Sequence, residues 1–219
     1  SAGIAPAIND AMGAGIPVVA VDTGVSGAEV TSFVATDNYA VATVQGAVAA
    51  TLVEDGQPII YVTGNQAQST GQERMNGFME AFAAARPNSE ILQVPTEWNS
   101  QEAQEGVEAI LNSRQDIAMV ANAWDGGTMG AKAALENLGF GAGDVKLVGF
   151  DGAGDAIAAM DDGWVHANTA QMLYQMGYQG IKAAAAAARG EDVSARIDTG
   201  FFLVTPATSG TYKAMVGIE

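Results

Sequence analysis

Two aspartates and a glutamine stand where predicted buried strands end. Asp151 comes directly after the apolar run 147–150, Asp22 follows the run 18–21, and Gln171 closes a third strand. Ligands of parallel α/β sheets bind outside the carboxyl ends of the strands, so we expect these side chains to share a cleft. Carboxylate and amide groups in such a cleft would hydrogen-bond a small, hydroxyl-rich molecule. This favours a binding protein over a catalyst.

Two tryptophans belong to the same predicted sheet edge. Trp98 follows the strand that ends near Pro95, and Trp124 follows the strand that ends at Ala121. One interpretation is that each indole only caps the core. The other is a sugar site, in which the apolar C–H face of a sugar or polyol stacks on indole while its hydroxyls meet polar groups.

Arg74 lies in the first turns of the helix that follows the loop 64–69. It could form a surface ion pair with Glu73 or Glu80. The alternative is that its guanidinium faces the cleft and donates two hydrogen bonds to adjacent ligand hydroxyls, because the planar guanidinium fork suits paired acceptors.

Common enzyme patterns are missing from the sequence. It contains no cysteine and a single histidine, His166, which lies on a predicted strand and is interpreted as structural. It has no phosphate-binding glycine loop, nucleophile elbow or histidine-pair metal motif. We therefore expect no catalysis, no cofactor and no metal.

The charge balance argues against nucleic acid as a partner. The chain has 25 acidic and nine basic residues, a formal net charge of −16. A surface this negative repels phosphate backbones and anionic membranes.

Apolar runs alternate with amphipathic segments along the whole chain. Strands are expected at 16–21, 32–35, 59–63, 91–95, 117–121, 145–150, 165–169 and 201–204. Helices are expected at about 4–12, 38–54, 70–85, 100–112, 127–138, 155–161 and 174–188. This alternation predicts βαβ crossovers and an α/β fold with doubly wound parallel sheets.

Taken in order, several short segments resemble the periplasmic sugar-binding proteins of ABC transporters, in the ribose-binding type with the type I periplasmic binding fold. The segments are 7–8 with 14–22, 35–38, Arg74 with Gly77 and Phe78, Trp124 and Asp125 with 129–131, 148–152, and Ala170 with Gln171. The resemblance covers essentially the whole chain.

The resemblance implies a ligand site and a class of ligand. It implies ligand hydrogen bonds from polar strand-end and helix residues, and an aromatic contact from Trp98. Trp124 replaces an asparagine of the ribose binders and Thr23 replaces an arginine, which favours another monosaccharide or a sugar alcohol. The expected ligand-binding residues are Asp22, Arg74, Trp98, Trp124, Asp125, Asp151 and Gln171.

The resemblance also implies two lobes joined by three crossovers, near 36–38, 169–172 and 200–204. The expected division is 1–37 with 172–200 for the N-terminal lobe and 38–171 with 201–219 for the C-terminal lobe. Family members carry a long further segment before the equivalent of Ser1. We therefore expect an incomplete N-terminal lobe and a chain that is part of a longer protein.

Three functions are compatible with such a fold. The first is the solute-binding component of an ABC importer, periplasmic or extracellular with or without a lipid anchor, monomeric when intact, and partnered by a membrane permease. The second is the effector-binding core of a LacI-type repressor, against which the −16 charge argues. The third is a doubly wound enzyme of the flavodoxin or receiver type, whose phosphate loop or acidic cluster is not visible.

Overall fold

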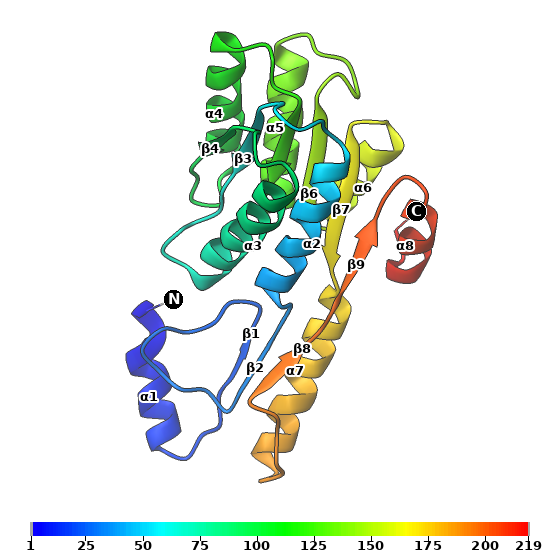
Figure 1. Cartoon of the computed structure of the whole chain (residues 1–219). Helices are drawn as coiled ribbons and strands as arrows, with labels where there is room; N and C mark the ends of the chain where they lie inside the picture. Colours follow the sequence, from blue (N-terminus) through cyan, green and yellow to red (C-terminus); the bar gives the residue numbers. More distant parts are fainter. Residues whose placement is uncertain (1, 219) are drawn as a thin grey trace.

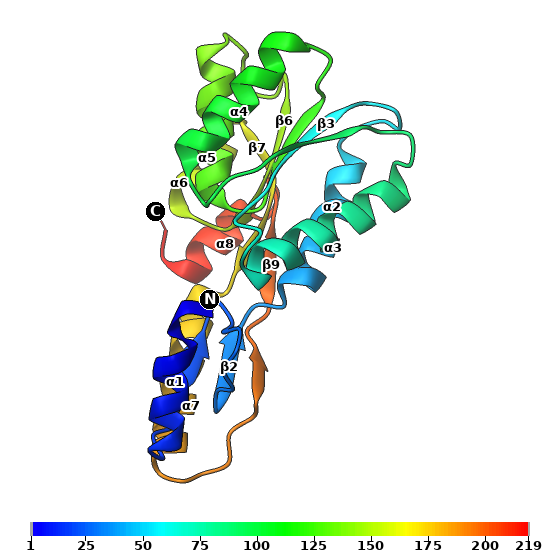
Figure 2. The ribbon, with the colours of Figure 1, turned by 90° about the vertical axis from the view of Figure 1, so that its left-hand side faces the viewer.

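The computed structural model describes residues 2–218, which form a smaller and a larger lobe (Figure 1). The smaller lobe is built on a three-stranded parallel sheet in the order β1-β2-β8. Its elements are η1 (Ala2–Ile4), α1 (Ala5–Gly13), β1 (Val19–Val21), β2 (Ser32–Ala35), α7 (Leu173–Ala188) and β8 (Arg196–Asp198). Helix α7 packs Met176 and Ala183 against Val34 of β2. Figure 2 shows α1 and α7 together on one face of this sheet.

The larger lobe is built on a six-stranded sheet in the order β4-β3-β5-β6-β7-β9, parallel except for β9. Its strands are β3 (Ile59–Val62), β4 (Ile91–Val94), β5 (Met119–Asn122), β6 (Lys146–Asp151), β7 (Val165–Gln171) and β9 (Phe201–Val204). Its helices are α2 (Asn38–Thr51), α3 (Ser69–Ala85), α4 (Ser100–Ser113), α5 (Asp125–Asn137), α6 (Gly154–Asp161) and α8 (Ser209–Val216). Helices α2 and α3 cover one face of the sheet, and α4 and α5 the other (Figure 2). Strands β3 and β5 are buried at every residue, as expected for parallel strands covered on both faces.

The chain passes between the two sheets three times, after β2, after β7 and after β8. Arg196 ties two of these passages together, since its guanidinium donates to the carbonyls of Ala35 and Thr36, both at 3.0 Å. The Asp198 carboxylate accepts from the backbone N–H groups of Asp37 at 3.2 Å and Gly200 at 3.0 Å. We propose that these passages form the hinge, and we keep the lobe boundaries expected from the sequence as a proposal.

The doubly wound α/β prediction is confirmed, and the lobe expected to be incomplete has three strands within residues 2–218. Some boundaries were wrong. The strand expected from Ile16 begins only at Val19, because Pro17 has no N–H to give to a neighbouring strand. Strand β7 continues to Gln171. Elements β8 and α8 were not predicted.

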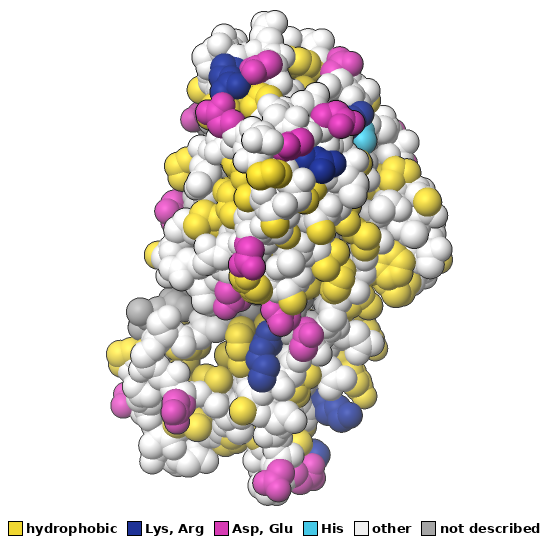
Figure 3. Space-filling model, in the orientation of Figure 1, with side chains coloured by type: hydrophobic (Ala, Val, Ile, Leu, Met, Phe, Trp, Pro, Cys, Tyr) yellow, Lys and Arg dark blue, Asp and Glu magenta, His cyan; other side chains and the backbone are white. Residues whose placement is uncertain are grey.

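Among the charged side chains on the face drawn in Figure 3, acidic ones outnumber basic ones. Figure 3 shows acidic side chains scattered over both lobes and few basic ones, in keeping with the net charge of −16. Within residues 2–218, no helix combines the length and the apolar character needed to cross a bilayer.

Candidate functional site

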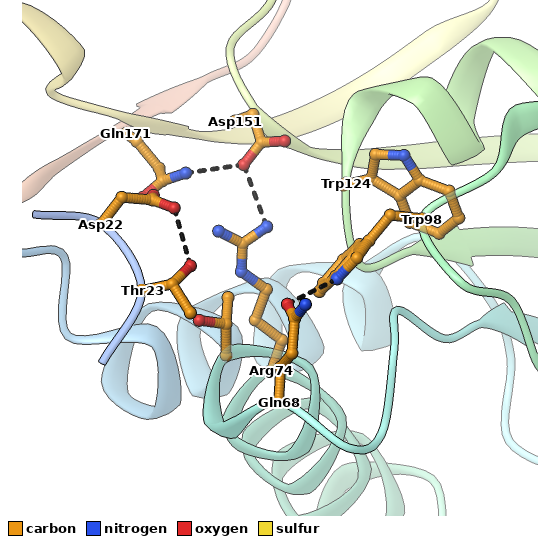
Figure 4. A pocket seen from close by; sticks show the side chains of 9 residues that line it. Asp22, Thr23, Gln68, Arg74, Trp98, Trp124, Asp151 and Gln171 are labelled. Atoms are coloured by element: carbon orange, nitrogen blue, oxygen red, sulfur yellow. Dashed lines mark hydrogen bonds and ion pairs between the residues drawn. The ribbon is translucent and has the colours of Figure 1, made fainter. Parts of the chain in front are cut away.

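A cavity of about 310 Å³ opens between the two lobes. Asp22 and Thr23 reach it from the end of β1, and the remaining side chains come from the larger lobe and from the end of β7 (Figure 4). The lining residues are Asp22, Thr23, Gln68, Thr70, Arg74, Trp98, Trp124, Asp151 and Gln171. Six of the seven residues expected from the sequence therefore meet in one cavity, and Asp125 does not line it.

Arg74 is the central polar residue of the pocket. It lies on α3, is 3% exposed, and donates from Nη1 to Asp151 Oδ1 at 3.0 Å and to the carbonyl of Ala123 at 2.7 Å. Its Nε donates to Asn38 Oδ1 at 2.8 Å, and its guanidinium carbon lies 3.9 Å from the centre of the Phe150 ring. These contacts fix the guanidinium, so the interpretation as a surface ion pair with Glu73 or Glu80 is wrong. In the described part of the chain Nη2 has no hydrogen-bond partner, which leaves it available to a ligand.

The carboxylate of Asp151 connects the ends of two neighbouring strands. Its Oδ1 accepts from Arg74 and also from Gln171 Nε2 at 2.8 Å (Figure 4). Burial raises the pKa of Asp151, and the positive charge of Arg74 opposes that rise. The result is a polar wall of one guanidinium, one carboxylate and one amide, all held in place before a ligand arrives.

Opposite this polar wall stands an aromatic corner made by Trp98 and Trp124. Their ring centres are 5.3 Å apart and their planes cross at 88°, an edge-to-face arrangement. Trp98 Nε1 donates to Gln68 Oε1 at 2.8 Å. Gly64 leaves the space that the Trp98 ring occupies, because a Cβ at position 64 would overlap that ring. Both indoles line the cavity, although Trp124 is 9% exposed and also packs on the core.

Three lining residues have left-handed backbone conformations. Asp22 has a φ of 70°, Trp98 of 61° and Asp151 of 110°. Within residues 2–218 no other non-glycine residue has a positive φ. Such conformations cost roughly 1–3 kcal/mol each and gather where the surrounding structure aims a side chain at a ligand. Their coincidence with the cavity is independent of the side-chain chemistry and points to the same site.

Three lining residues were not expected as ligand contacts from the sequence. Thr23 was noted only as a substitution, and its Oγ1 donates to Asp22 Oδ2 at 2.9 Å. Gln68 closes the loop predicted at 64–69, and Thr70 lies in the first turn of α3, the helix that carries Arg74. The predicted loop indicated that residues near the start of this helix could line the cleft. The sequence could not show which of them do, because it does not give the path of the loop.

Asp125 departs from the expectation of a ligand contact. It is the first residue of α5 and is 2% exposed. Its carboxylate accepts hydrogen bonds from Ala153 and Asn168 and does not face the cavity. Burial and the nearby negative charge of Asp151 raise its pKa well above the ordinary value. Trp124, the residue before it, takes the place at the cavity wall.

His166 is half-buried on β7 and is not among the lining residues. Its Nδ1 lies 3.1 Å from the carbonyl oxygen of Trp164, and burial lowers its pKa. The side chains that do line the cavity suit hydrogen bonding to hydroxyl groups and stacking against an apolar face.

The sequence matches the family model described as periplasmic binding protein domain over residues 1–192. It is 31% identical over 209 residues to the ribose import binding protein of Escherichia coli K12, covering 92% of this chain and 70% of that protein. The D-allose-binding periplasmic protein of the same organism is 30% identical over 162 residues, which cover 72% of this chain and 50% of that protein.

Two solved structures extend the comparison. An ABC transporter solute-binding protein from Mycobacterium smegmatis with bound glycerol is 33% identical, with a TM-score of 0.84 over 95% of this chain and 72% of that one. An ABC transporter solute-binding protein from Bacillus halodurans C-125 with bound myo-inositol is 27% identical, with a TM-score of 0.87 over 94% of this chain and 72% of that one.

Proposed function

Because this chain belongs to the periplasmic binding protein domain family, we propose that it binds a neutral monosaccharide or a sugar alcohol between its lobes and performs no chemistry on it. It would act as the solute-binding component of an ABC importer. Closure of the two lobes on the ligand would be the signal that the transporter receives.

One observation carries this proposal. The Arg74–Asp151–Gln171 group and the Trp98–Trp124 corner face one cavity, to which the other lobe adds Asp22. Fixed donors and acceptors opposite indole faces suit a molecule with hydroxyls on one side and C–H groups on the other. Two lining carboxylates against one guanidinium disfavour an anionic ligand.

The relatives support the same ligand class. Two have names that refer to ribose or allose, and two structures hold glycerol or myo-inositol. All four are binding proteins by name, and three of the names refer to import or to an ABC transporter, which gives no support to the repressor or enzyme alternatives. Ribose is a less favoured ligand here, because Trp124 brings an indole to the cavity where the resemblance implies an asparagine.

A permease partner and a periplasmic or extracellular location follow from this role. Related proteins are described as periplasmic or as importer components. A lipid anchor, a monomeric state and the absence of nucleic-acid binding stay predictions.

A thermal-shift screen tests the proposal. The protein is expressed from its whole gene and heated with pentoses, hexoses and polyols, and in parallel with nucleotides and organic acids. A ligand that binds only the folded state raises the melting temperature with its concentration, so hits are expected among the neutral compounds.

The variant Asp151→Ala serves as the control, since its hits should disappear while the fold is retained. Stabilisation confined to nucleotides or organic acids would refute the proposal. So would turnover of the bound sugar, measured by NMR of the recovered ligand.

A further inference from the structure

The buried carboxylate of Asp125 joins three elements directly behind the cavity. Its Oδ2 accepts from the backbone N–H of Ala153 at 2.7 Å, in the turn after β6. Its Oδ1 accepts from Asn168 Nδ2 of β7, also at 2.7 Å. One side chain thus connects the start of α5 to the two strands that carry Asp151 and Gln171.

The turn that Asp125 holds is conformationally costly. Asp151 has a φ of 110° and the next residue, Gly152, a φ of 80°, so two consecutive residues are left-handed. A side chain at position 152 would overlap the Tyr212 hydroxyl, which donates to the Gly152 carbonyl at 2.9 Å. The turn is therefore held from two sides, by Asp125 through Ala153 and by Tyr212 through Gly152.

The backbone of Asp125 also contacts the Asp151 side chain. The backbone N–H of Asp125 hydrogen-bonds the Asp151 carboxylate and so opposes the rise that burial causes in the Asp151 pKa. Asp125 thus holds the Asp151 segment through its side chain and stabilises the ionised Asp151 carboxylate through its backbone. A buried Asp125 carboxylate this close to the Asp151 carboxylate opposes folding, so a purely stabilising role would be met better by a neutral side chain.

We propose that Asp125 is a positioning residue for the pocket: its hydrogen bonds to Ala153 and Asn168 hold the turn that aims the Asp151 carboxylate at Arg74 and Gln171. The predicted effect of Asp125 on ligand affinity rests on the proposed function. The predicted effect of Asp125 on the conformation of the turn is independent of it.

The first measurement therefore needs no ligand. Amide hydrogen exchange of Ala153, followed by NMR, should be faster in Asp125→Ala than in the wild type, while amides of β3 keep their rates. Asp125→Asn should restore slow exchange. The carbonyl oxygen of the new asparagine side chain can still accept from Ala153. Its amide can donate to Asn168 Oδ1 once the Asn168 side-chain amide rotates by about 180°, because that oxygen has no hydrogen-bond partner among the described residues.

The second measurement is calorimetric titration with D-ribose, D-allose and myo-inositol as probes. Asp125→Ala should weaken the binding of any probe that the wild type binds by about tenfold or more, as expected for the loss of a charged hydrogen-bond acceptor. Asp125→Asn should stay within about threefold of the wild type, by the same conversion. Asp155→Ala is the matched control, because Asp155 is an exposed acid four residues after Asp151 whose carboxylate, within residues 2–218, accepts a hydrogen bond only from the N–H of Ala156. It should bind like the wild type.

Two results would overturn the proposal: unchanged Ala153 exchange in Asp125→Ala, or equal weakening of binding in the Ala and Asn variants. If Asp125→Ala does not fold, Asp125→Ser takes its place, since a serine has one acceptor and cannot span both donors. If the wild type binds none of the probes, the proposed ligand class is in doubt, and the exchange measurement still decides the role of Asp125.

Discussion

The Arg74 guanidinium and the Asp151 carboxylate form an ion pair, 3.0 Å between Nη1 and Oδ1, that joins α3 to the end of β6 in the wall of the interlobe cavity. The Arg74 side chain is almost fully buried, and Asp151 keeps 26% of its side chain exposed. One partner is thus fixed by the protein while the other stays open to a ligand. A pair arranged in this way is set up for recognition as well as for stability.

Removing the Asp151 carboxylate should abolish much of the ligand affinity. Truncating a charged hydrogen-bond partner in a closed site costs about 2–4 kcal/mol, so Asp151→Ala should weaken binding by roughly 30- to 1000-fold. Calorimetric titration measures this. Asp116→Ala, which breaks an exposed pair with Arg114, is the control and should bind normally. An unchanged dissociation constant in Asp151→Ala would remove Asp151 from the site.

At Asp22, the effect of backbone strain on stability can be measured separately from the effect of the side chain on ligand binding. Asp22 is exposed, and its φ of 70° is one that glycine adopts without strain. Asp22→Gly should leave the free energy of unfolding within about 1 kcal/mol of the wild type or raise it, yet weaken ligand binding by about tenfold.

Chemical denaturation and titration of the same samples check both halves of the Asp22 prediction. Asp22→Asn tolerates the same backbone conformation and should lose less affinity than the glycine variant. A stable Asp22→Gly protein with full affinity would show that Asp22 does not contact the ligand.

The position of Trp98 depends on the missing side chain of Gly64. In Gly64→Ala the new methyl group overlaps the indole, so the Trp98 ring must move and its edge-to-face contact with Trp124 changes. We expect a changed near-ultraviolet circular dichroism spectrum and about tenfold weaker binding, comparable to losing one aromatic contact.

Gly210→Ala is the control for this substitution. Gly210 lies on α8, is exposed, and has open space where the methyl group would go. An unchanged spectrum and unchanged affinity in Gly64→Ala would contradict the proposed role of the aromatic corner.

Asp125 should leave a signature in the pH dependence of stability. Its pKa is raised in the folded protein, so between the ordinary Asp pKa near 3.9 and the raised value the native state binds more protons than the unfolded chain. Stability from this group is therefore greatest below about pH 4 and declines as the pH rises and Asp125 ionises. In Asp125→Asn that decline is absent.

Melting temperatures of both proteins across this range test the sign. The difference, variant minus wild type, should grow as the pH rises. Parallel curves would show that Asp125 ionises with an ordinary pKa.

The strands of the larger lobe were predictable because burial on both faces leaves continuous apolar runs, such as Ile59–Val62. Strand β8 (Arg196–Asp198) was missed because it is short, largely exposed and carries two charged side chains, so it shows no apolar pattern. Helix α8 (Ser209–Val216) begins with Ser, Gly and Thr, which read as a loop.

The candidate site was predictable to a similar extent, and for a related reason. A polar residue after a buried strand must lie at the sheet edge, which is how Asp151 and Gln171 were found. Sequence could not show which side of a helix start faces the cavity. Trp124 and Asp125 are adjacent, yet one lines the cavity and the other turns into the core. The left-handed backbone conformation of Trp98 could not be predicted from the sequence either, because tryptophan has no preference for a positive φ.

The most direct test of the central claim is a crystal structure of the protein expressed from its whole gene, in complex with the neutral sugar or polyol that stabilises it most. We predict ligand density between the Trp98–Trp124 corner and the Arg74–Asp151 pair, with hydroxyl oxygens about 3 Å from Arg74, Asp151 and Asp22. Density for that ligand elsewhere on the protein, with this cavity empty, would contradict the account.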